Sequence, residues 1–92
     1  MTREEVKKMV EIHNNNIDDF TSNILPQLLE LADVNVITEE NGEHKIPLDA
    51  WFKAQKFIKA MNFYKVAMEI LDTVRPLGFD VKIDMQSNKL VY

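Results

Sequence analysis

The amino-acid sequence predicts an α+β fold in which two long helices, kinked or interrupted, alternate with two β-hairpins. Three observations lead to this prediction. Apolar residues recur at helical spacing over two long stretches of the chain. An Asn-Gly pair separates two short strand-like segments. The final segment, FDVKIDMQSNKLVY, alternates apolar and polar side chains. The hairpins are expected to form one small antiparallel sheet packed on the helices.

The composition is that of a single soluble domain covering residues 1–92. The hydrophobic share of 46% and the charged share of 28% are ordinary for a globular protein. Without cysteine, the chain has neither a disulfide framework nor a thiolate metal site, which fits a reducing compartment. No apolar run approaches the ~18 residues of a membrane-spanning helix, and MTREEVKK lacks the apolar core of a signal peptide. We therefore expect a cytoplasmic protein with no membrane contact.

The first helix is predicted to span residues 3–33 without a break. Thr2 and Glu5 have capping-box spacing at its start. The triplet Asn14–Asn16 looks like a breaking point, but the apolar stripe keeps its phase across it and His13 fills the missing position. Pro26 is the expected kink, with its ring pointing away from the stripe. The stripe consists of Val6, Val10, Ile17, Phe20, Ile24, Leu28 and Leu31.

A first hairpin is predicted over residues 34–47. Asn41-Gly42 favours a type I′ turn, because both residues accept the positive φ angles of that turn. This turn would place Ile37 opposite Ile46, and Pro47 would end the second strand.

The second helix is predicted over residues 49–75, with Asp49 as its N-cap and a stop at Pro76 and Gly78. Its apolar face changes sides near residues 60–62, so either the helix breaks there or it passes between two cores. The cluster before this point is Ala50, Trp51, Ala54, Phe57, Ile58 and Met61, and the cluster after it is Phe63, Val66, Ala67, Ile70 and Val74.

The second hairpin is predicted over residues 79–92, around a turn at Ser87-Asn88. This turn would set Met85 opposite Leu90. The buried face is expected to contain Phe79, Val81, Ile83 and Met85.

Charge and length both suggest association. Residues 1–43 carry three basic and ten acidic residues, a net charge of −7, whereas residues 44–92 carry eight basic and five acidic residues, a net charge of +3. A straight 31-residue helix spans about 46 Å, while a globule of this length measures about 32 Å across. If the helix is continuous, its overhanging stripe requires a partner. A second copy of the chain is the simplest one, and a homo-oligomer is expected.

The sequence contains no catalytic, cofactor or metal signature. The two histidines lack metal-ligand spacing, and Ser22 and Ser87 lack the setting of a nucleophile. His13 is interpreted as a core residue with one hydrogen-bonded nitrogen, in preference to a pH switch or a ligand. His44 is interpreted as solvated. We therefore predict that the chain is not an enzyme and binds no cofactor.

The candidate interaction residues lie on the second helix. Lys53, Lys56 and Lys59 form a spiral row, and Phe52 and Tyr64 fall outside the two apolar clusters. Exposed aromatic residues beside lysines are typical of a protein interface. A solvated face and a phosphate-backbone contact are the competing interpretations.

The leading functional hypothesis is a non-catalytic, homo-oligomeric protein-interaction module whose partner is another protein. It would act as an adaptor or a small inhibitor, and its size and composition suit a phage or mobile-element accessory protein. The first alternative is a nucleic-acid-binding protein that uses the lysine row, although the pI of about 5.1 argues against it. The second alternative is a protein that binds a small phosphate-containing ligand at an oligomer interface.

Overall fold

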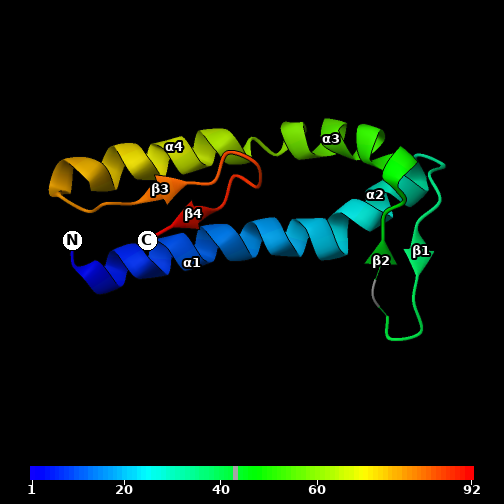
Figure 1. Cartoon of the computed structure of the whole chain (residues 1–92), viewed down its shortest axis with the longest axis horizontal. Coiled ribbons are helices and arrows are strands. Elements are labelled where there is room, and N and C mark those ends of the chain that lie inside the picture. Colours follow the sequence, from blue (N-terminus) through cyan, green and yellow to red (C-terminus); the bar gives the residue numbers. More distant parts are fainter. Residues whose placement is uncertain (43) are drawn as a thin grey trace. The chain divides into compact units, whose positions relative to one another are not determined.

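The structure, a computed structural model, describes residues 1–42 and 44–92 and mixes helices with short strands, as predicted (Figure 1). It contains two compact units. Unit 1 consists of Met1–Ile17 and Asn62–Tyr92, and unit 2 consists of Asp18–Met61. The expectation of a single domain stays a prediction. The helices are α1 (Arg3–Asp19), α2 (Leu25–Leu31), α3 (Trp51–Ala60) and α4 (Phe63–Val74), and the strands are β1 (Ile37–Thr38), β2 (His44–Lys45), β3 (Lys82–Ile83) and β4 (Leu90–Val91).

Helix α1 begins with the predicted capping box and includes the whole asparagine triplet. The Glu5 N–H donates to Thr2 Oγ1 at 3.2 Å, and the Thr2 N–H donates to Glu5 Oε1 at 3.4 Å. Residues Asn14–Asn16 are helical, so the phase of the neighbouring apolar residues was the correct guide.

A π turn over Phe20–Ile24 joins α1 to α2 with no non-helical residue between them. Its hydrogen bond runs from the Leu25 N–H to the Phe20 C=O, five residues back. Such a turn holds one residue more than an α turn, so the apolar stripe shifts by one position. Leu25 and Leu29 are therefore buried, whereas Ile24 and Leu31, which a straight helix would bury, are exposed.

Pro26 explains the π turn and corrects the expected orientation of its ring. Proline has no N–H for an α-helical bond, and its ring crowds the carbonyl four residues back. Widening the preceding turn relieves this crowding. The Pro26 side chain is fully buried instead of pointing away from the core. The helix ends at Leu31, where Asp33 takes a positive φ of 60° and the Val34 N–H donates to the Leu29 C=O at 2.8 Å.

The second helical segment is interrupted at the predicted place. Helix α3 ends at Ala60, Asn62 adopts a left-handed conformation with φ 55°, and α4 starts at Phe63. Of the two explanations for the change of apolar face, the break is therefore correct. The expected Asp49 cap is wrong, because Asp49 lies within a 3-10 turn, Leu48–Ala50, and no side-chain cap bond precedes α3.

Strands β1 and β2 pair with a register that differs by one residue from the expectation. Ile37 pairs with Lys45, not with Ile46. The turn differs as well: the Gly42 N–H donates to the Glu39 C=O at 2.9 Å, and Gly42 has a φ of 83°, but Asn41 does not have a positive φ. A type I′ turn needs two positive φ angles, so the predicted turn type is wrong. Residue 43, inside the predicted hairpin, lies outside the described residues.

Strands β3 and β4 form a second antiparallel pair, in which Ile83 faces Leu90. The expected partner of Leu90 was Met85, which is 67% exposed and belongs to the turn. Because β1–β2 and β3–β4 are separate pairs, the prediction of one shared sheet is wrong. Each strand contributes only two residues to its ladder. A sheet that contained all four strands would need further backbone hydrogen bonds between the two pairs.

Asp84 organises the turn between β3 and β4. Its carboxylate accepts hydrogen bonds from the Gln86 N–H and the Ser87 hydroxyl, both at 3.0 Å. These donors, led by the Gln86 amide, favour the charged form and lower the pKa of Asp84 below its usual 3.8. Asn88 closes the turn with a φ of 61°, and its N–H donates to the Asp84 C=O at 2.7 Å.

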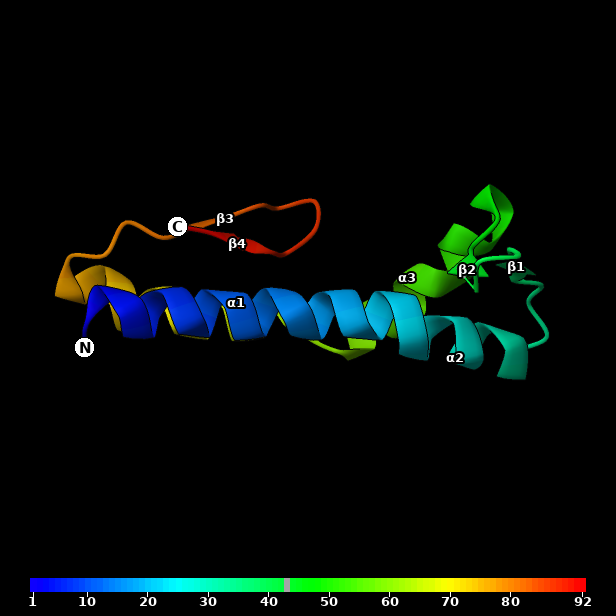
Figure 2. The ribbon, with the colours of Figure 1, turned by 90° about the horizontal axis from the view of Figure 1, so that it is seen from below.

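The core of unit 1 lies between α1, α4 and the β3–β4 pair. Leu71, absent from the expected cluster, is buried here, whereas Val66 is 41% exposed. Figure 2 shows the strand pair on one side of α1. The buried apolar residues are Val6, Val10, Ala67, Leu71, Val74, Val81 and Leu90.

Two polar side chains of α1 attach the strand pair to this core. His13, 3% exposed, hydrogen-bonds through Nε2 to the Asn88 C=O at 2.8 Å and meets Phe63 edge-on. The interpretation of His13 as a core residue with one hydrogen-bonded nitrogen is confirmed. Asn14 makes a reciprocal pair with Leu90: Nδ2 donates to the Leu90 C=O and Oδ1 accepts from the Leu90 N–H, both at 2.8 Å.

In unit 2, α2 packs on α3. The buried apolar residues of this unit include Phe20, Leu25, Pro26, Leu29, Ala50 and Ala54. Within the described ranges, no helix combines the length and the apolar character needed to cross a bilayer.

Candidate binding surfaces

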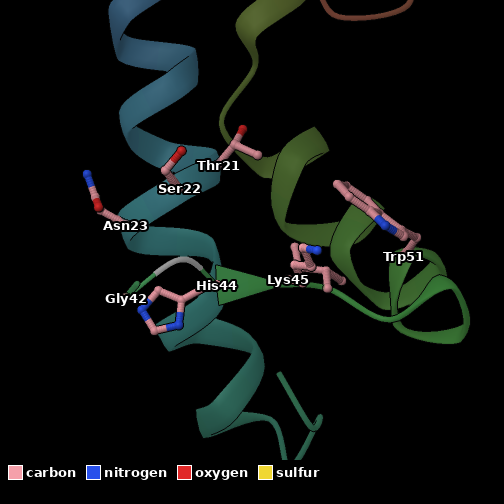
Figure 3. Close-up of a pocket in the computed structure, with 8 residues that line it drawn as sticks. Thr21, Ser22, Asn23, Gly42, His44, Lys45 and Trp51 are labelled. Carbon is pink, nitrogen blue, oxygen red and sulfur yellow. The ribbon is translucent and has the colours of Figure 1, made fainter. Parts of the chain in front are cut away.

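Unit 2 contains a pocket of about 660 Å³ between the π turn, β2 and the start of α3. The π turn contributes Thr21, Ser22 and Asn23, and Trp51, half-buried, forms a wall. In the view of Figure 3, Lys45 and Trp51 lie on one side of the π turn, and Asn23 and His44 lie on the other. The full lining is Thr21, Ser22, Asn23, Gly42, His44, Lys45, Ile46 and Trp51.

This pocket offers hydrogen-bonding groups and one cation beside a flat aromatic surface. The Lys45 ammonium lies 2.7 Å from Glu39 Oε1, so an anionic ligand would compete with a carboxylate for it. Both partners are well exposed, and such pairs contribute little free energy, so the competition costs little. The indole can stack on a planar ring. The combination suits a small molecule that carries both a ring and an anionic group.

Sequence reasoning did not find this pocket. The sequence points to Ser22 only as a possible nucleophile, and no motif or spacing draws attention to Thr21 or Asn23. The available signal was Pro26, because a proline inside a helical pattern can force a π turn, and π turns occur frequently at functional sites. His44, expected to be only solvated, is exposed and also lines the pocket.

The outward side of α3 brings together four of the five predicted interaction residues. Lys53, Lys56, Lys59 and Phe52 line one hollow of about 580 Å³, which Gln55 completes. Phe52 is 88% exposed, and Leu48, one turn earlier, is 90% exposed. Ala54 lies on the opposite, buried side of the helix. The name "α3 outer face" is used below for Leu48, Phe52, Lys53, Lys56 and Lys59.

None of the three lysine ammonium groups of the α3 outer face has an ion pair or a hydrogen bond with another described residue. Three positive charges are therefore left uncompensated around an exposed aromatic ring. Tyr64, the fifth predicted residue, lies on α4 in unit 1. It is 47% exposed and does not line this hollow.

A third hollow, of about 210 Å³, lies between α1 and α4 in unit 1. Four of its six lining residues are apolar, and His13 and Asn16 are the polar ones. The residues are Met9, Ile12, His13, Asn16, Val66 and Ile70.

Among residues 1–42 and 44–92, no group of three or more acidic or histidine side chains is placed to hold a metal ion. Comparisons with protein-family models, with curated proteins and with solved structures find no match to the chain.

Proposed function

We propose that the chain is a non-catalytic binding protein that contacts another protein through the α3 outer face. The observation that carries this proposal is Phe52, which is 88% exposed and shares a hollow with three lysines that form no ion pair with any described residue. Aromatic side chains that insert into a partner's pocket supply a large part of the binding energy of protein interfaces. The uncompensated lysines favour a partner whose pocket is bordered by carboxylates.

The exposed leucine and phenylalanine favour a protein partner over a nucleic acid. Phosphate-backbone binding uses cations and polar donors, and an aliphatic side chain such as Leu48, 90% exposed, adds nothing to it. The net charge of −4 also opposes binding to a polyanion. Occupying an acidic, apolar pocket on another protein is how an adaptor or a small inhibitor acts. The cytoplasmic location and the homo-oligomeric state expected from the sequence belong to this proposal.

The α3 outer face can be tested with displayed random peptides. The wild-type chain is expected to select peptides rich in Asp, Glu and large apolar residues. Phe52→Ala and Lys56→Glu should each weaken binding of a selected peptide about tenfold or more, because each removes a central contact. The matched controls are Leu31→Ala, another exposed leucine of unit 2, and Lys82→Glu, an exposed lysine of unit 1. Affinities are measured by fluorescence anisotropy.

Two outcomes would contradict the proposal. One is selection of peptides without an acidic bias, with affinities that Phe52→Ala leaves unchanged. The other is tight binding of a labelled single-stranded DNA or RNA that weakens steeply with salt and is lost in Lys56→Glu, which would establish the nucleic-acid alternative.

A second candidate function rests on the pocket of unit 2. Half-buried Trp51, Lys45 and the hydroxyl-bearing Ser22 and Thr21 line one pocket, a set of groups that suits a small phosphate-containing ligand with a planar base. This form of the phosphate-ligand hypothesis places the site within one unit rather than at an oligomer interface.

Trp51 reports on this pocket directly, because it is the only tryptophan of the chain. Titration with AMP is expected to quench its fluorescence to saturation, since the base would stack on the indole. Adenosine should bind more weakly than AMP, and Lys45→Gln should abolish that difference, because it removes the cation that meets the phosphate. If neither AMP nor adenosine changes the fluorescence, this second function is wrong.

A further inference from the structure

The β3–β4 pair covers one side of the helix pair of unit 1 (Figure 2). On this side, Asn14 makes two hydrogen bonds to the backbone of Leu90, and Val81 and Leu90 belong to the buried cluster of unit 1. Around α1, Ile12 and Met9 precede Asn14 by two and five residues, spacings that place them on roughly the opposite side of the helix. On that other side lie four apolar residues, Met9 and Ile12 of α1 and Val66 and Ile70 of α4, which border the hollow of about 210 Å³. These four residues are called the apolar strip.

The apolar strip is exposed to an unusual degree for residues so close to a core. Ile12 is 51% exposed and Val66 is 41% exposed, while Met9 and Ile70 are half-buried against the core of unit 1. The exposed Ile12 side chain borders a hollow, so one surface carries both a side chain that could insert into a partner and a recess that could receive one. An interface that joins two identical surfaces by a two-fold axis requires this self-complementarity.

We propose that the apolar strip binds the same strip of a second copy, forming a two-fold symmetric dimer. Charge supports a second copy as the occupant. Close to a two-fold axis, a residue lies near its own counterpart, so a charged strip would repel itself. None of the four strip residues carries a charge.

The border of the strip carries opposite charges on its two helices. Lys8 lies one turn before Ile12 on α1, and Glu69 lies one turn after Val66 on α4, and both are exposed. A two-fold rotation that places α1 of one copy over α4 of the other brings Lys8 of each copy toward Glu69 of its partner. Two equivalent attractive pairs then fix the orientation of the dimer.

The size of the surface sets the expected affinity. The 17 residues of α1 rise about 25 Å, and two packed helices are about 18 Å wide, which gives about 450 Å² per copy. The total of about 900 Å² lies below the roughly 1,200–2,000 Å² of stable interfaces, so a weak dimer is expected.

This inference deepens the homo-oligomeric part of the proposed function, but it uses residues of unit 1, whereas the α3 outer face belongs to unit 2. Sedimentation velocity of the full chain is measured from about 1 to about 500 µM, a range wide enough to detect a weak dimer. The wild-type chain is expected to change from monomer to dimer. Ile12→Asp should remain monomeric throughout. Met85→Asp, an equally non-conservative change at an exposed residue of unit 1, should dimerise like the wild type.

The charged border gives an independent test that leaves the apolar strip intact. Lys8→Glu should weaken the dimer about tenfold at low salt, and Lys8→Glu combined with Glu69→Lys should restore it, because the swap recreates both pairs. Peptide binding through the α3 outer face should be unchanged in all of these variants. A wild-type chain that stays monomeric at the highest concentration overturns the inference. A dimer that Ile12→Asp and Lys8→Glu both leave intact overturns it as well.

Discussion

Replacing Leu29 by alanine is expected to lower the free energy of unfolding by about 2–5 kcal/mol, whereas replacing Leu31 should change it by less than about 0.5 kcal/mol. Leu29 is 0% exposed and Leu31 is 84% exposed. The two substitutions remove the same atoms from the same helix, and leucine and alanine both favour helix. The difference between the variants therefore measures burial alone.

The comparison tests the π turn over Phe20–Ile24, because a straight α-helix would place Leu28 and Leu31 in the core instead. Urea unfolding followed by Trp51 fluorescence reports directly on unit 2, which contains Leu29, Leu31 and Trp51. Equal losses of stability in the two variants, or a larger loss for Leu31→Ala, would show that the apolar stripe does not shift.

Replacing Asn14 by alanine is expected to destabilise the protein by about 2–4 kcal/mol, although alanine favours helix more than asparagine does. Asn14 makes two hydrogen bonds of 2.8 Å to the backbone of Leu90, a residue that is only 3% exposed. Removing the amide leaves a backbone donor and a backbone acceptor without partners where water has little access. The strand pair β3–β4 should loosen from α1.

Asn15 is the matched control, because it is exposed and adjacent in the same helix. Asn15→Ala should stabilise the protein by about 0.5 kcal/mol through helix propensity alone. Thermal unfolding by circular dichroism measures both variants, and hydrogen exchange of the Leu90 amide should accelerate only in Asn14→Ala. If Asn14→Ala and Asn15→Ala shift the melting temperature in the same direction and by the same amount, the hydrogen-bonding role of Asn14 is contradicted.

The asparagine triplet illustrates how far sequence reasoning can go. The continuity of α1 through Asn14–Asn16 was predictable, because apolar residues on both sides keep one helical phase. The role of Asn14 was not predictable. Its two partners lie 76 residues away in the chain, and nothing local distinguishes its side chain from that of Asn15.

For the strand pairs too, the positions of the strands were predictable from the sequence, whereas their pairing was not. The alternating pattern and the turn residues predicted where strands occur, but both registers were wrong. Register depends on the turn that forms. Among the described residues of the two turns, positive φ angles fall at Gly42 in one and at Asn88 in the other. For the candidate sites, the α3 outer face followed from the helical spacing of Phe52 and the lysines. The pocket of unit 2 did not, because a π turn and two separate segments form it.

Local sequence patterns were sufficient to predict the helices, the interruption at residues 60–62, the capping box and the outward row of Phe52 and the lysines. Each of these depends on periodicity or on residues within one or two turns of each other, where spacing alone dictates geometry. Tertiary structure decided the shift of the apolar stripe at Pro26, both strand registers, the hydrogen bonds of His13 and Asn14 to Asn88 and Leu90, and the apolar strip between α1 and α4. These features depend on which distant segments meet and on which side of a helix pair stays uncovered, and a local pattern carries no information about either.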